Sequence, residues 1–361
     1  MKVLTVAGTR PQLVKVAPVS RELRKQMKEI LVNTGQHYDY NMAGVFFEEL
    51  HIPKPDYDLG IGSASHGKQT GEMLKKIEEV LVEEKPDAVL VYGDTNSTLA
   101  GALAASKLHI PLIHVEAGLR SYNKKMPEEI NRVLTDHVSN VLFAPTERAV
   151  ENLRKEGIGE NVFHVGDVMY DAFLYNSSLA EKKYSLEMFG LESKKYLLAT
   201  IHRAENTDSW ERLHAIFQSF STLNDTVFLP LHPRTRRKLE ENGLIEIVHK
   251  ADNIKIVEPV SYLEMLLLEK HAKAIVTDSG GVQKEAYFAK VPCFTLRAET
   301  EWVETVEVGC NRLVNPLEED LAKVIQQFEP TDFSAPLYGD GKASEKIANI
   351  IADFLSNSSR L

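Results

Sequence analysis

The sequence predicts an α/β protein made of two doubly wound, Rossmann-like domains that face a cleft. Short runs rich in Val, Ile and Leu alternate with amphipathic stretches along the whole chain, a pattern typical of parallel strands joined by right-handed crossovers. The alternation pauses after Asp167 and then restarts, so there are two such series. The length of 361 residues also exceeds the ~250 to 300 at which one hydrophobic core usually stops growing.

The first series begins with a buried strand and a helix that has a proline in its first turn, Pro11 to Met27. A later helix runs from Pro127 to about Ser139, and its periodicity predicts a buried face made of Ile130, Val133, Leu134, His137 and Val138. The strands of this series are predicted at 2–8, 29–35, 87–94, 112–118, 141–146 and 162–167.

The second series follows a polar, helical stretch without a strand, residues 168–195. Its strands are predicted at 196–201, 226–231, 254–259, 274–278, 292–296 and 311–315, and one amphipathic helix, 343–355, follows them. We therefore place an N-terminal domain at 1–170, a C-terminal domain at 171–340 and a final helical segment at 341–361.

Composition narrows the class of protein. A hydrophobic content of 43% and a charged content of 26% are typical of a folded domain, and a formal charge of -10 argues against a nucleic-acid surface. The two cysteines, Cys293 and Cys310, have neither metal-ligand nor disulfide-framework spacing, which favours the reducing cytosol. The N-terminal apolar run is too short for a signal peptide, and no stretch is long enough to span a membrane.

The end of the first strand is a candidate anion site. Gly8, Thr9, Arg10 and Pro11 lead into a helix that carries Lys15 one turn later. Free N–H groups at a helix start attract phosphate, and two cations would reinforce them. A plain turn followed by a solvated basic helix face remains the alternative.

The stretch AIVTDSGGVQKEA repeats this arrangement in the second series. Its strand ends at Asp278, and a phosphate could approach the amides of Ser279, Gly280 and Gly281 because no Cβ obstructs the glycines. Glu285, further along the helix, could accept hydrogen bonds from ribose hydroxyls. The alternative is a glycine turn that only lets helix and strand pack.

Three carboxylates form a second constellation. Asp94 and Glu116 follow consecutive strands, and ligands of open parallel sheets bind at the carboxyl ends of strands. Glu128 opens the helix at Pro127, where it could instead form a surface pair with Arg132. Acids crowded into one cleft raise one another's pKa values, which suits general acid and base catalysis.

His202 ends a strand of the second series, beside Arg203 and Glu205. The sequence has no HxxxH, HExxH or CxxC pattern, so a metal site has little support. The absence of GxGxxG after the first strand disfavours nicotinamide chemistry, and the absence of GxSxG disfavours a hydrolase.

Eight motifs, in order, resemble the non-hydrolysing UDP-N-acetylglucosamine 2-epimerases. They span roughly residues 1 to 300 and read GTRPQLVKVAPV, TGQHYD, GDTNST, HVEAGLRS, PEEINR, HRAEN, HPR and TDSGGVQKEA. The resemblance implies the two-domain fold shared with GT-B glycosyltransferases, with the last helix packed back on the N-terminal domain. It also implies a homodimer that interconverts UDP-GlcNAc and UDP-ManNAc without a cofactor or an obligatory metal.

The resemblance also implies roles for individual residues. Asp94, Glu116 and Glu128 match the catalytic carboxylates of the family, and Arg132 and His202 match supporting residues. Substrate-binding residues would be Arg10, Lys15, Ser279, Gly280, Gly281 and Glu285. Which carboxylate takes the C2 proton stays open.

Some positions depart from the family pattern. Lys284 precedes Glu285 where many bacterial members have a second Glu, and Trp302 stands where many have an Arg. Bacterial members bind a second, activating UDP-GlcNAc beside a QH loop and an Arg; here Gln36 and His37 persist, but Lys68 stands where the Arg is expected.

Two other functions share these features. A GT-B glycosyltransferase would need an acceptor and would not exchange the C2 proton with solvent. A catalytically silent nucleotide-sugar sensor would not need the acids Asp94, Glu116 and Glu128.

Overall fold

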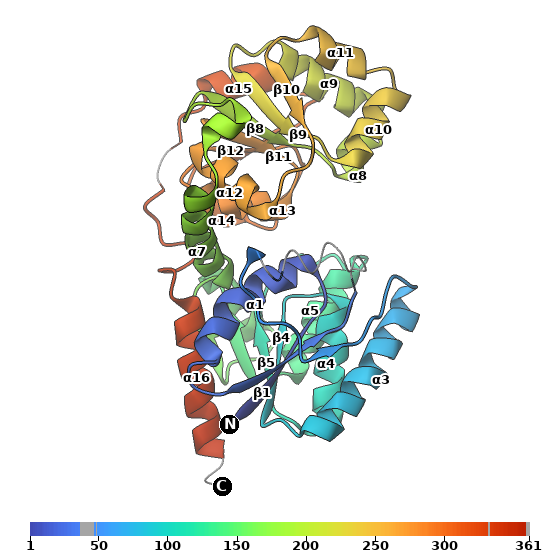
Figure 1. Ribbon diagram of the computed structural model, residues 1–361, viewed down its shortest axis with the longest axis vertical. Helices are drawn as coiled ribbons and strands as arrows, with labels where there is room; N and C mark the ends of the chain where they lie inside the picture. Colours follow the sequence, from blue (N-terminus) through green and yellow to red (C-terminus); the bar gives the residue numbers. More distant parts are fainter. Residues whose placement is uncertain (37–46, 48, 331–332, 359–361) are drawn as a thin grey trace. The chain divides into compact units, whose positions relative to one another are not determined.

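The structure is a computed structural model that describes residues 1–36, 47, 49–330 and 333–358. It divides into two compact units, Met1–Leu174 with Tyr338–Leu361, and Tyr175–Leu337 (Figure 1). The division falls within helix α7, Val168–Lys183. The chain therefore leaves the N-terminal unit at α7 and returns to it for the last helix.

The N-terminal unit contains a seven-stranded parallel sheet among its described residues, in the order β3-β2-β1-β4-β5-β6-β7. The strands are β1 (Lys2–Ala7), β2 (Lys28–Asn33), β3 (Tyr57–Asp58), β4 (Ala88–Tyr92), β5 (Leu112–Val115), β6 (Val141–Ala144) and β7 (Val162–His164). The helices are α1 (Arg10–Leu23), α3 (His66–Glu84), α4 (Asn96–Lys107), α5 (Pro127–Val138), α6 (Glu147–Lys155) and α16 (Ala343–Ser358).

Helices cover this sheet because its strands are apolar on both sides. Leu4 and Val6 of β1 pack in one cluster with Met73 and Ile77 of α3 and with the alanines of α4. Helix α16 lies beside α1 (Figure 1), where Gln26 Nε2 donates to Asn349 Oδ1 over 2.8 Å. The Asp171 carboxylate accepts the amide N–H groups of Ala343 and Ser344 and so caps the start of α16.

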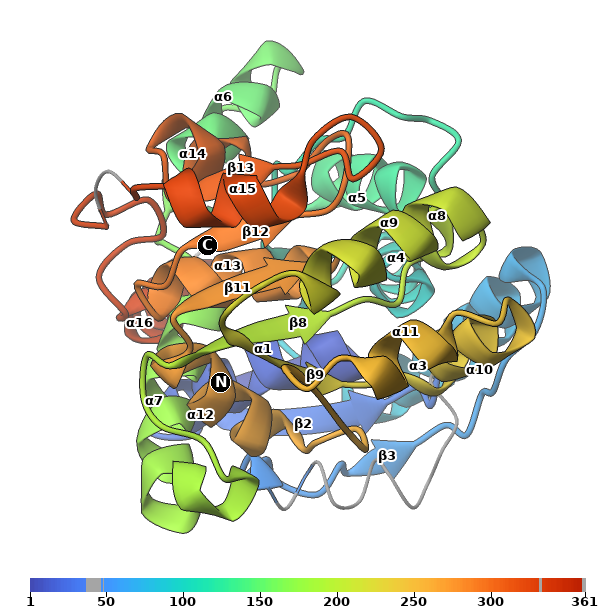
Figure 2. The ribbon, with the colours of Figure 1, turned by 90° about the horizontal axis from the view of Figure 1, so that it is seen from above.

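The C-terminal unit contains a six-stranded parallel sheet among its described residues, in the order β10-β9-β8-β11-β12-β13, and Figure 2 shows most of these strands side by side. The strands are β8 (Tyr196–Thr200), β9 (Thr226–Pro230), β10 (Ile254–Val257), β11 (Ala274–Thr277), β12 (Cys293–Thr295) and β13 (Asn311–Leu313). The helices are η1 (Leu186–Phe189), α8 (Ala204–Thr207), α9 (Trp210–Ser221), α10 (Pro233–Glu241), α11 (Ile245–Lys250), α12 (Tyr262–His271), α13 (Gly280–Phe288), α14 (Val303–Glu307) and α15 (Leu321–Gln327).

Alternate residues of strands β8 to β12 enter two different cores. Leu197 and Ala199 of β8 pack with α9, α11 and α15, whereas Tyr196 and Leu198 pack with α12 and α13. This period of two places α12 and α13 on one face of the sheet.

The predicted fold class is confirmed, since each of the twelve predicted strands overlaps an observed one. The prediction missed β3, which is only two residues long and is held by Val32 and Asn33 of β2. Such a short strand has no periodicity that a sequence pattern could reveal.

The predicted buried face of α5 is wrong. Ile130 and Leu134 are 48% and 44% exposed, and His137 is exposed too. The side chains of α5 that are buried are instead polar: Glu129, Asn131, Arg132, Thr135 and Asp136. The inward face of α5 thus holds hydrogen-bonded and charged groups, and these contact the candidate site described next.

Candidate active site

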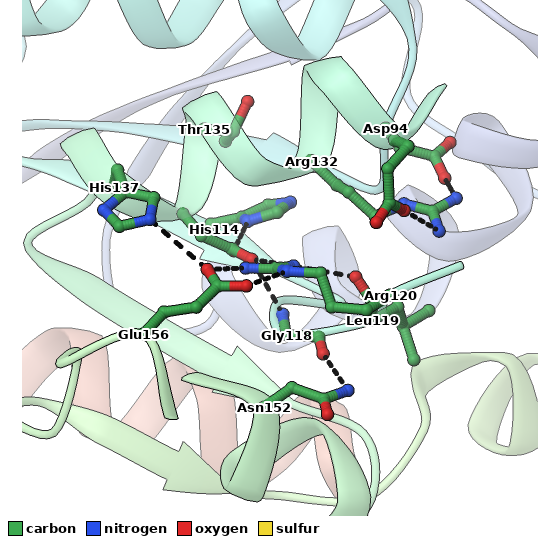
Figure 3. Close-up of polar contacts among 12 residues, drawn as sticks. Asp94, His114, Gly118, Leu119, Arg120, Arg132, Thr135, His137, Asn152 and Glu156 are labelled. Atoms are coloured by element: carbon green, nitrogen blue, oxygen red, sulfur yellow. Dashed lines mark hydrogen bonds and ion pairs between the residues drawn. The ribbon is translucent and has the colours of Figure 1, made fainter. Parts of the chain in front are cut away.

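Asp94 lies in the turn after β4 and is held by two residues of α5. Arg132 Nη2 donates to Asp94 Oδ2, and Asn131 Nδ2 donates to the Asp94 carbonyl over 2.9 Å. Figure 3 shows the Arg132 guanidinium reaching Asp94. The Asp94 side chain is 31% exposed and that of Arg132 is 10% exposed. A carboxylate that is fixed but still accessible can act on a bound molecule.

Glu116 lies in the turn after the neighbouring strand β5, where it forms an ion pair with Lys15 of α1. Both side chains are largely buried, at 8% and 13% exposure. Glu116 has a φ of 71°, a left-handed conformation that is uncommon for residues other than glycine. Its N–H and that of Ala117 both donate to the Phe143 carbonyl, which holds this conformation.

Gly93 brings the turn that carries Asp94 close to the ion pair of Glu116 and Lys15. It precedes Asp94, and a Cβ at Gly93 would lie 3.2 Å from Glu116 Oε2 and 3.3 Å from Lys15 Nζ. Its φ of 63° also favours glycine. A larger residue at 93 would therefore press on the ion pair.

A row of paired polar and charged side chains lies beneath this turn (Figure 3). His114 Nε2 donates to the Gly93 carbonyl over 2.7 Å, and His114 Nδ1 lies 2.7 Å from Asp136 Oδ1. Arg120 contacts Asp136 Oδ2 and also binds both oxygens of Glu156, each over 2.7 Å. Burial alone would raise the pKa of Asp136, but the contacts with His114 and Arg120 outweigh it and hold that pKa below its usual range. An ionised Asp136 therefore orients the imidazole that fixes Gly93.

Glu128 and Glu129 are adjacent but differ in environment. Glu128 is exposed in the first turn of α5. Glu129 is buried, and its carboxylate accepts Ser121 N–H over 2.8 Å and Tyr122 N–H over 2.8 Å. Burial alone would raise the pKa of Glu129, but these hydrogen bonds outweigh it and lower the pKa. Arg132, considered above as a surface partner of Glu128, contacts Asp94 and Glu129.

The start of α1 is tied to β4 by Gln12, a residue that sequence reasoning did not single out. Gln12 Oε1 accepts the Gly8 N–H over 2.9 Å, and Gln12 Nε2 donates to the Tyr92 carbonyl over 2.9 Å. Arg10, in the first turn of α1, is exposed. The Gln in GTRPQ was the available signal, because a Gln at the third helical position often completes a capping box.

Gln36 lies close to the start of α4. Its Oε1 accepts the N–H of Ser97 over 3.0 Å and the Oγ–H of Ser97 over 2.7 Å. Ser97 Oγ and Thr34 Oγ1, 2.8 Å apart, face Gly8, where a Cβ would lie 1.8 Å from Thr34 Oγ1. Lys68 is exposed in the first turn of α3. His37 lies outside the described residues.

The second predicted site lies in the C-terminal unit, at the turn from β11 to α13. Ser279 is the N-cap of α13, and Gly280 and Gly281 are its first two residues. A Cβ at Gly280 would meet no atom closer than 3.7 Å, and one at Gly281 would meet nothing within 4 Å. Packing of this unit therefore does not require glycine at either position. Close approach of a ligand to the helix N-terminus would require it.

His202 is positioned by Asp278, a residue not predicted to have a role. Asp278 is wholly buried, accepts the backbone N–H groups of His202 and Arg203, and lies 3.1 Å from His202 Nδ1. Burial alone would raise the pKa of Asp278, but the hydrogen bonds from His202 and Asn206 outweigh it and lower the pKa. The His202 side chain is 40% exposed, so its ring is oriented yet accessible.

Two of the three departures from the family pattern, Lys284 and Trp302, are in contact with each other. Lys284 Nζ lies 4.1 Å from the centre of the Trp302 ring, and both side chains are buried. Such a cation–π contact stabilises a buried lysine. Lys284 and Trp302 therefore belong to one local contact.

Residues 1–36, 47, 49–330 and 333–358 contain no group of three or more His, Cys, Asp or Glu side chains that could hold a metal ion. A second finding covers the same part of the chain: it has no helix with the length and hydropathy needed to cross a membrane.

The two doubly wound parallel sheets, with acids at the strand ends of one and a glycine-opened helix in the other, define an α/β protein of the GT-B-like class. A family model for UDP-N-acetylglucosamine 2-epimerase matches residues 21–352. The chain belongs to the UDP-N-acetylglucosamine 2-epimerase family, as the motifs predicted.

Individual relatives agree with this assignment. A Methanococcus maripaludis protein described as a UDP-N-acetylglucosamine 2-epimerase homolog is 57% identical, over 97% of this chain and 99% of its own. The crystal structure of the Methanocaldococcus jannaschii UDP-GlcNAc 2-epimerase in complex with UDP-GlcNAc and UDP is similar with a TM-score of 0.86 and 49% identity, over 98% of this chain and 100% of its own. A UDP-2,3-diacetamido-2,3-dideoxy-D-glucuronate 2-epimerase of Pseudomonas aeruginosa is 48% identical, over 98% and 99% of the two chains.

Proposed function

We propose that this protein interconverts UDP-GlcNAc and UDP-ManNAc by inverting C2 of the sugar. A base removes the C2 proton while the bond between C1 and the diphosphate oxygen breaks, so that UDP leaves anti and 2-acetamidoglucal forms. UDP then adds back at C1, and C2 receives a proton on the opposite face. The family membership and the UDP-GlcNAc-bound relative support this assignment.

One observation carries the proposal: Asp94 and Glu116 follow adjacent strands, and each contacts a cation of its own unit. The C2 proton is poorly acidic, so its removal needs a positioned base. Inversion is served by more than one carboxylate, because the proton leaves and returns on different faces. In this proposal Lys15 and Arg10 stabilise charge on the departing oxygens. Glu128 is the third catalytic acid, and Arg132 holds Asp94.

The C-terminal unit binds UDP in this proposal. The amides of Ser279, Gly280 and Gly281 receive the diphosphate, and Glu285 accepts hydrogen bonds from the ribose hydroxyls. The absence of any packing requirement at Gly280 and Gly281 supports the diphosphate assignment. His202, fixed by Asp278, supports the leaving group.

A second candidate substrate is UDP-2,3-diacetamido-2,3-dideoxy-D-glucuronate. The Pseudomonas aeruginosa relative named for this sugar is 48% identical, against 49% for the Methanocaldococcus jannaschii enzyme, so identity does not separate the two substrates. The C2 chemistry would be the same for both.

The decisive experiment incubates the purified protein with each nucleotide sugar in D2O, without metal or NAD, and follows C2 by NMR. Deuterium at C2 together with the inverted sugar supports the epimerase, and the ratio of the two initial rates identifies the substrate. Unlabelled sugar contradicts the proposal. Product that forms only after an acceptor sugar is added would indicate a glycosyltransferase instead.

We further propose a cytoplasmic homodimer. Cys293 and Cys310 are both buried and are not joined in a disulfide, which fits a reducing compartment. Light scattering of the purified protein should give twice the monomer mass of 40.6 kDa, and the monomer mass would contradict the dimer.

A further inference from the structure

Three buried side-chain amides form a continuous row that ends at the Asp94 turn: Gln69 of α3, Asn96 of α4 and Asn131 of α5. Each residue is only 6% exposed. Asn131 Nδ2 donates to Asn96 Oδ1 over 3.2 Å, and Asn96 Nδ2 donates to Gln69 Oε1 over 2.9 Å. The row thus joins three helices of the N-terminal unit by hydrogen bonds between side chains, the least common kind in proteins.

Both ends of this amide row are backbone carbonyl groups. Asn131 Nδ2 donates to the Asp94 carbonyl over 2.9 Å, and Gln69 Nε2 donates to the Gly62 carbonyl over 3.1 Å. A carbonyl oxygen can only accept a hydrogen bond, so each end fixes which amide atom faces it. Asn96 then has one orientation that satisfies both of its neighbours. Reversing the amide at any of the three positions would bring two donors or two acceptors together.

Asp94 is held by two successive residues of α5. Arg132 Nη2 donates to the Asp94 carboxylate, whereas Asn131 holds the Asp94 backbone through its carbonyl. The Asp94 side chain is 31% exposed, so packing alone does not fix its position. A base must lie within hydrogen-bond reach of the proton that it removes, and a displacement of about 1 Å can lower a rate about 10²-fold. The backbone that carries Asp94 therefore has to be held as well as its carboxylate.

We propose that Asn131 is a positioning residue for Asp94, and that Asn96 and Gln69 hold Asn131 in the orientation that this role requires. The inference rests on the proposed catalytic role of Asp94. A buried polar network in which the members satisfy one another is rigid and specifies a single arrangement. Loss of Asn96 or Gln69 loosens Asn131 without removing its contact with Asp94, so the effect on turnover should decrease along the row away from Asp94.

The first test compares variants along the row by their turnover and their affinity for UDP. Asn131→Ala should lower turnover about 10- to 10²-fold, Asn96→Ala should lower it less, and Gln69→Ala least. The affinity for UDP should stay within about twofold of wild type in all three variants, because the proposed UDP site lies in the other unit. Initial rates followed by NMR measure the turnover, and calorimetry measures the affinity. A weaker affinity with unchanged turnover would overturn the proposal.

Asn253→Ala is the matched control for Asn131→Ala. Asn253 Nδ2 also donates to backbone carbonyls, those of Phe220 and Leu223, but it lies directly before β10 in the C-terminal unit. A loss of turnover in Asn131→Ala that is no larger than the loss in Asn253→Ala would overturn the proposal. If Asn131→Ala does not fold, Asn131→Asp decides in the same way, since it keeps the shape of the side chain and lacks only the N–H donors.

An Asp94→Asn background separates positioning from general structural damage. Once the Asp94 carboxylate is gone, holding its backbone in place no longer serves the reaction. Asn131→Ala should therefore change the remaining turnover by no more than about twofold in this background, although it lowers the turnover of wild type about 10- to 10²-fold. The same loss in both backgrounds would overturn the positioning role.

Hydrogen exchange followed by mass spectrometry tests the contact independently of catalysis. The backbone amides of residues 93–96 should exchange about tenfold faster in Asn131→Ala than in wild type, because local opening no longer breaks the hydrogen bond to the Asp94 carbonyl. They should exchange as in wild type in Asn253→Ala. Unchanged exchange in Asn131→Ala would overturn the contact itself. If Asp94→Asn turns over like wild type, the catalytic role of Asp94 fails and the positioning role fails with it, whatever the exchange shows.

Discussion

The glycines of the two units differ in whether packing within the unit requires a residue without a side chain. In the N-terminal unit, Gly8 and Gly93 are crowded: a side chain at either would press on Thr34, or on the pair formed by Lys15 and Glu116. At the start of α13 in the C-terminal unit, Gly281 faces open space. The N-terminal unit therefore builds its acid site from its own contacts, whereas the C-terminal unit leaves open space at the start of α13. Motif matching treats these glycines alike, but their surroundings distinguish them.

The largest expected effect concerns the acid site. Asp94→Asn should lower turnover about 10²- to 10⁴-fold, the usual contribution of a general acid or base, while UDP affinity stays within about twofold. Initial rates followed by NMR measure the turnover, and calorimetry measures the affinity for UDP. Asp225→Asn is the matched control, since Asp225 also pairs with a cation, Lys273, but precedes β9 at the opposite end of a strand. Equal losses in both variants would contradict a catalytic role for Asp94.

The comparison of glycines is tested by two alanine substitutions. Gly8→Ala places a Cβ 1.8 Å from Thr34 Oγ1 and should destabilise the protein by about 1 to 3 kcal/mol. Gly281→Ala should leave the unfolding free energy unchanged or slightly higher but weaken UDP binding about tenfold, because the methyl group would occupy the space proposed for the diphosphate. Urea unfolding measures the unfolding free energies of the two variants, and calorimetry measures their affinity for UDP. Normal UDP affinity in Gly281→Ala would refute the open-site interpretation.

Asp278 should make the unfolding free energy depend on pH in the acid range. Its pKa is lowered in the folded state, so its stabilisation is present above the unfolded pKa of about 3.9 and is lost as pH falls through the folded value. Asp278→Asn should therefore cost about 1 to 3 kcal/mol at pH 7 and flatten the acid side of the stability profile. Denaturant titrations from pH 2 to pH 7 measure this. A variant as stable as wild type at pH 7 would contradict the role of these hydrogen bonds.

The smallest effect concerns Gln36. Gln36→Ala removes the acceptor of Ser97 N–H and Oγ–H and should lower the unfolding free energy by about 1 kcal/mol.

If a second UDP-GlcNAc also binds beside Gln36, His37 and Lys68, traces of UDP-GlcNAc should accelerate the reaction of UDP-ManNAc in wild type, and Lys68→Ala should abolish the acceleration. Unchanged initial rates in wild type would end the allosteric hypothesis and leave Gln36 a structural residue.

The strands and the strand-end residues could be predicted because each depends on local sequence. A parallel strand buried on both faces is a continuous apolar run, and Asp94, Glu116 and His202 follow such runs directly. The orientation of α5 could not be predicted in this way. Periodicity assumes that apolar side chains face inward, but here the inward positions are occupied by Arg132 and Asp136, which bind site residues.

The residues that hold the site in place were missed for a related reason. Asp278 contacts the backbone of His202 across 76 positions of sequence, and Arg120 contacts Glu156 across 36. Such partners become visible only when the fold brings distant segments together.

The return of the chain at Tyr338 has a consequence for biosynthesis. A ribosome releases the N-terminus first, and domains usually mature in that order. Here the continuous segment Tyr175–Leu337 has all its residues before α16 is made, whereas the sheet that starts at Lys2 receives α16 only after that whole segment has been made. A released chain that ends at Leu337 should therefore protect the later half from protease better than the earlier half.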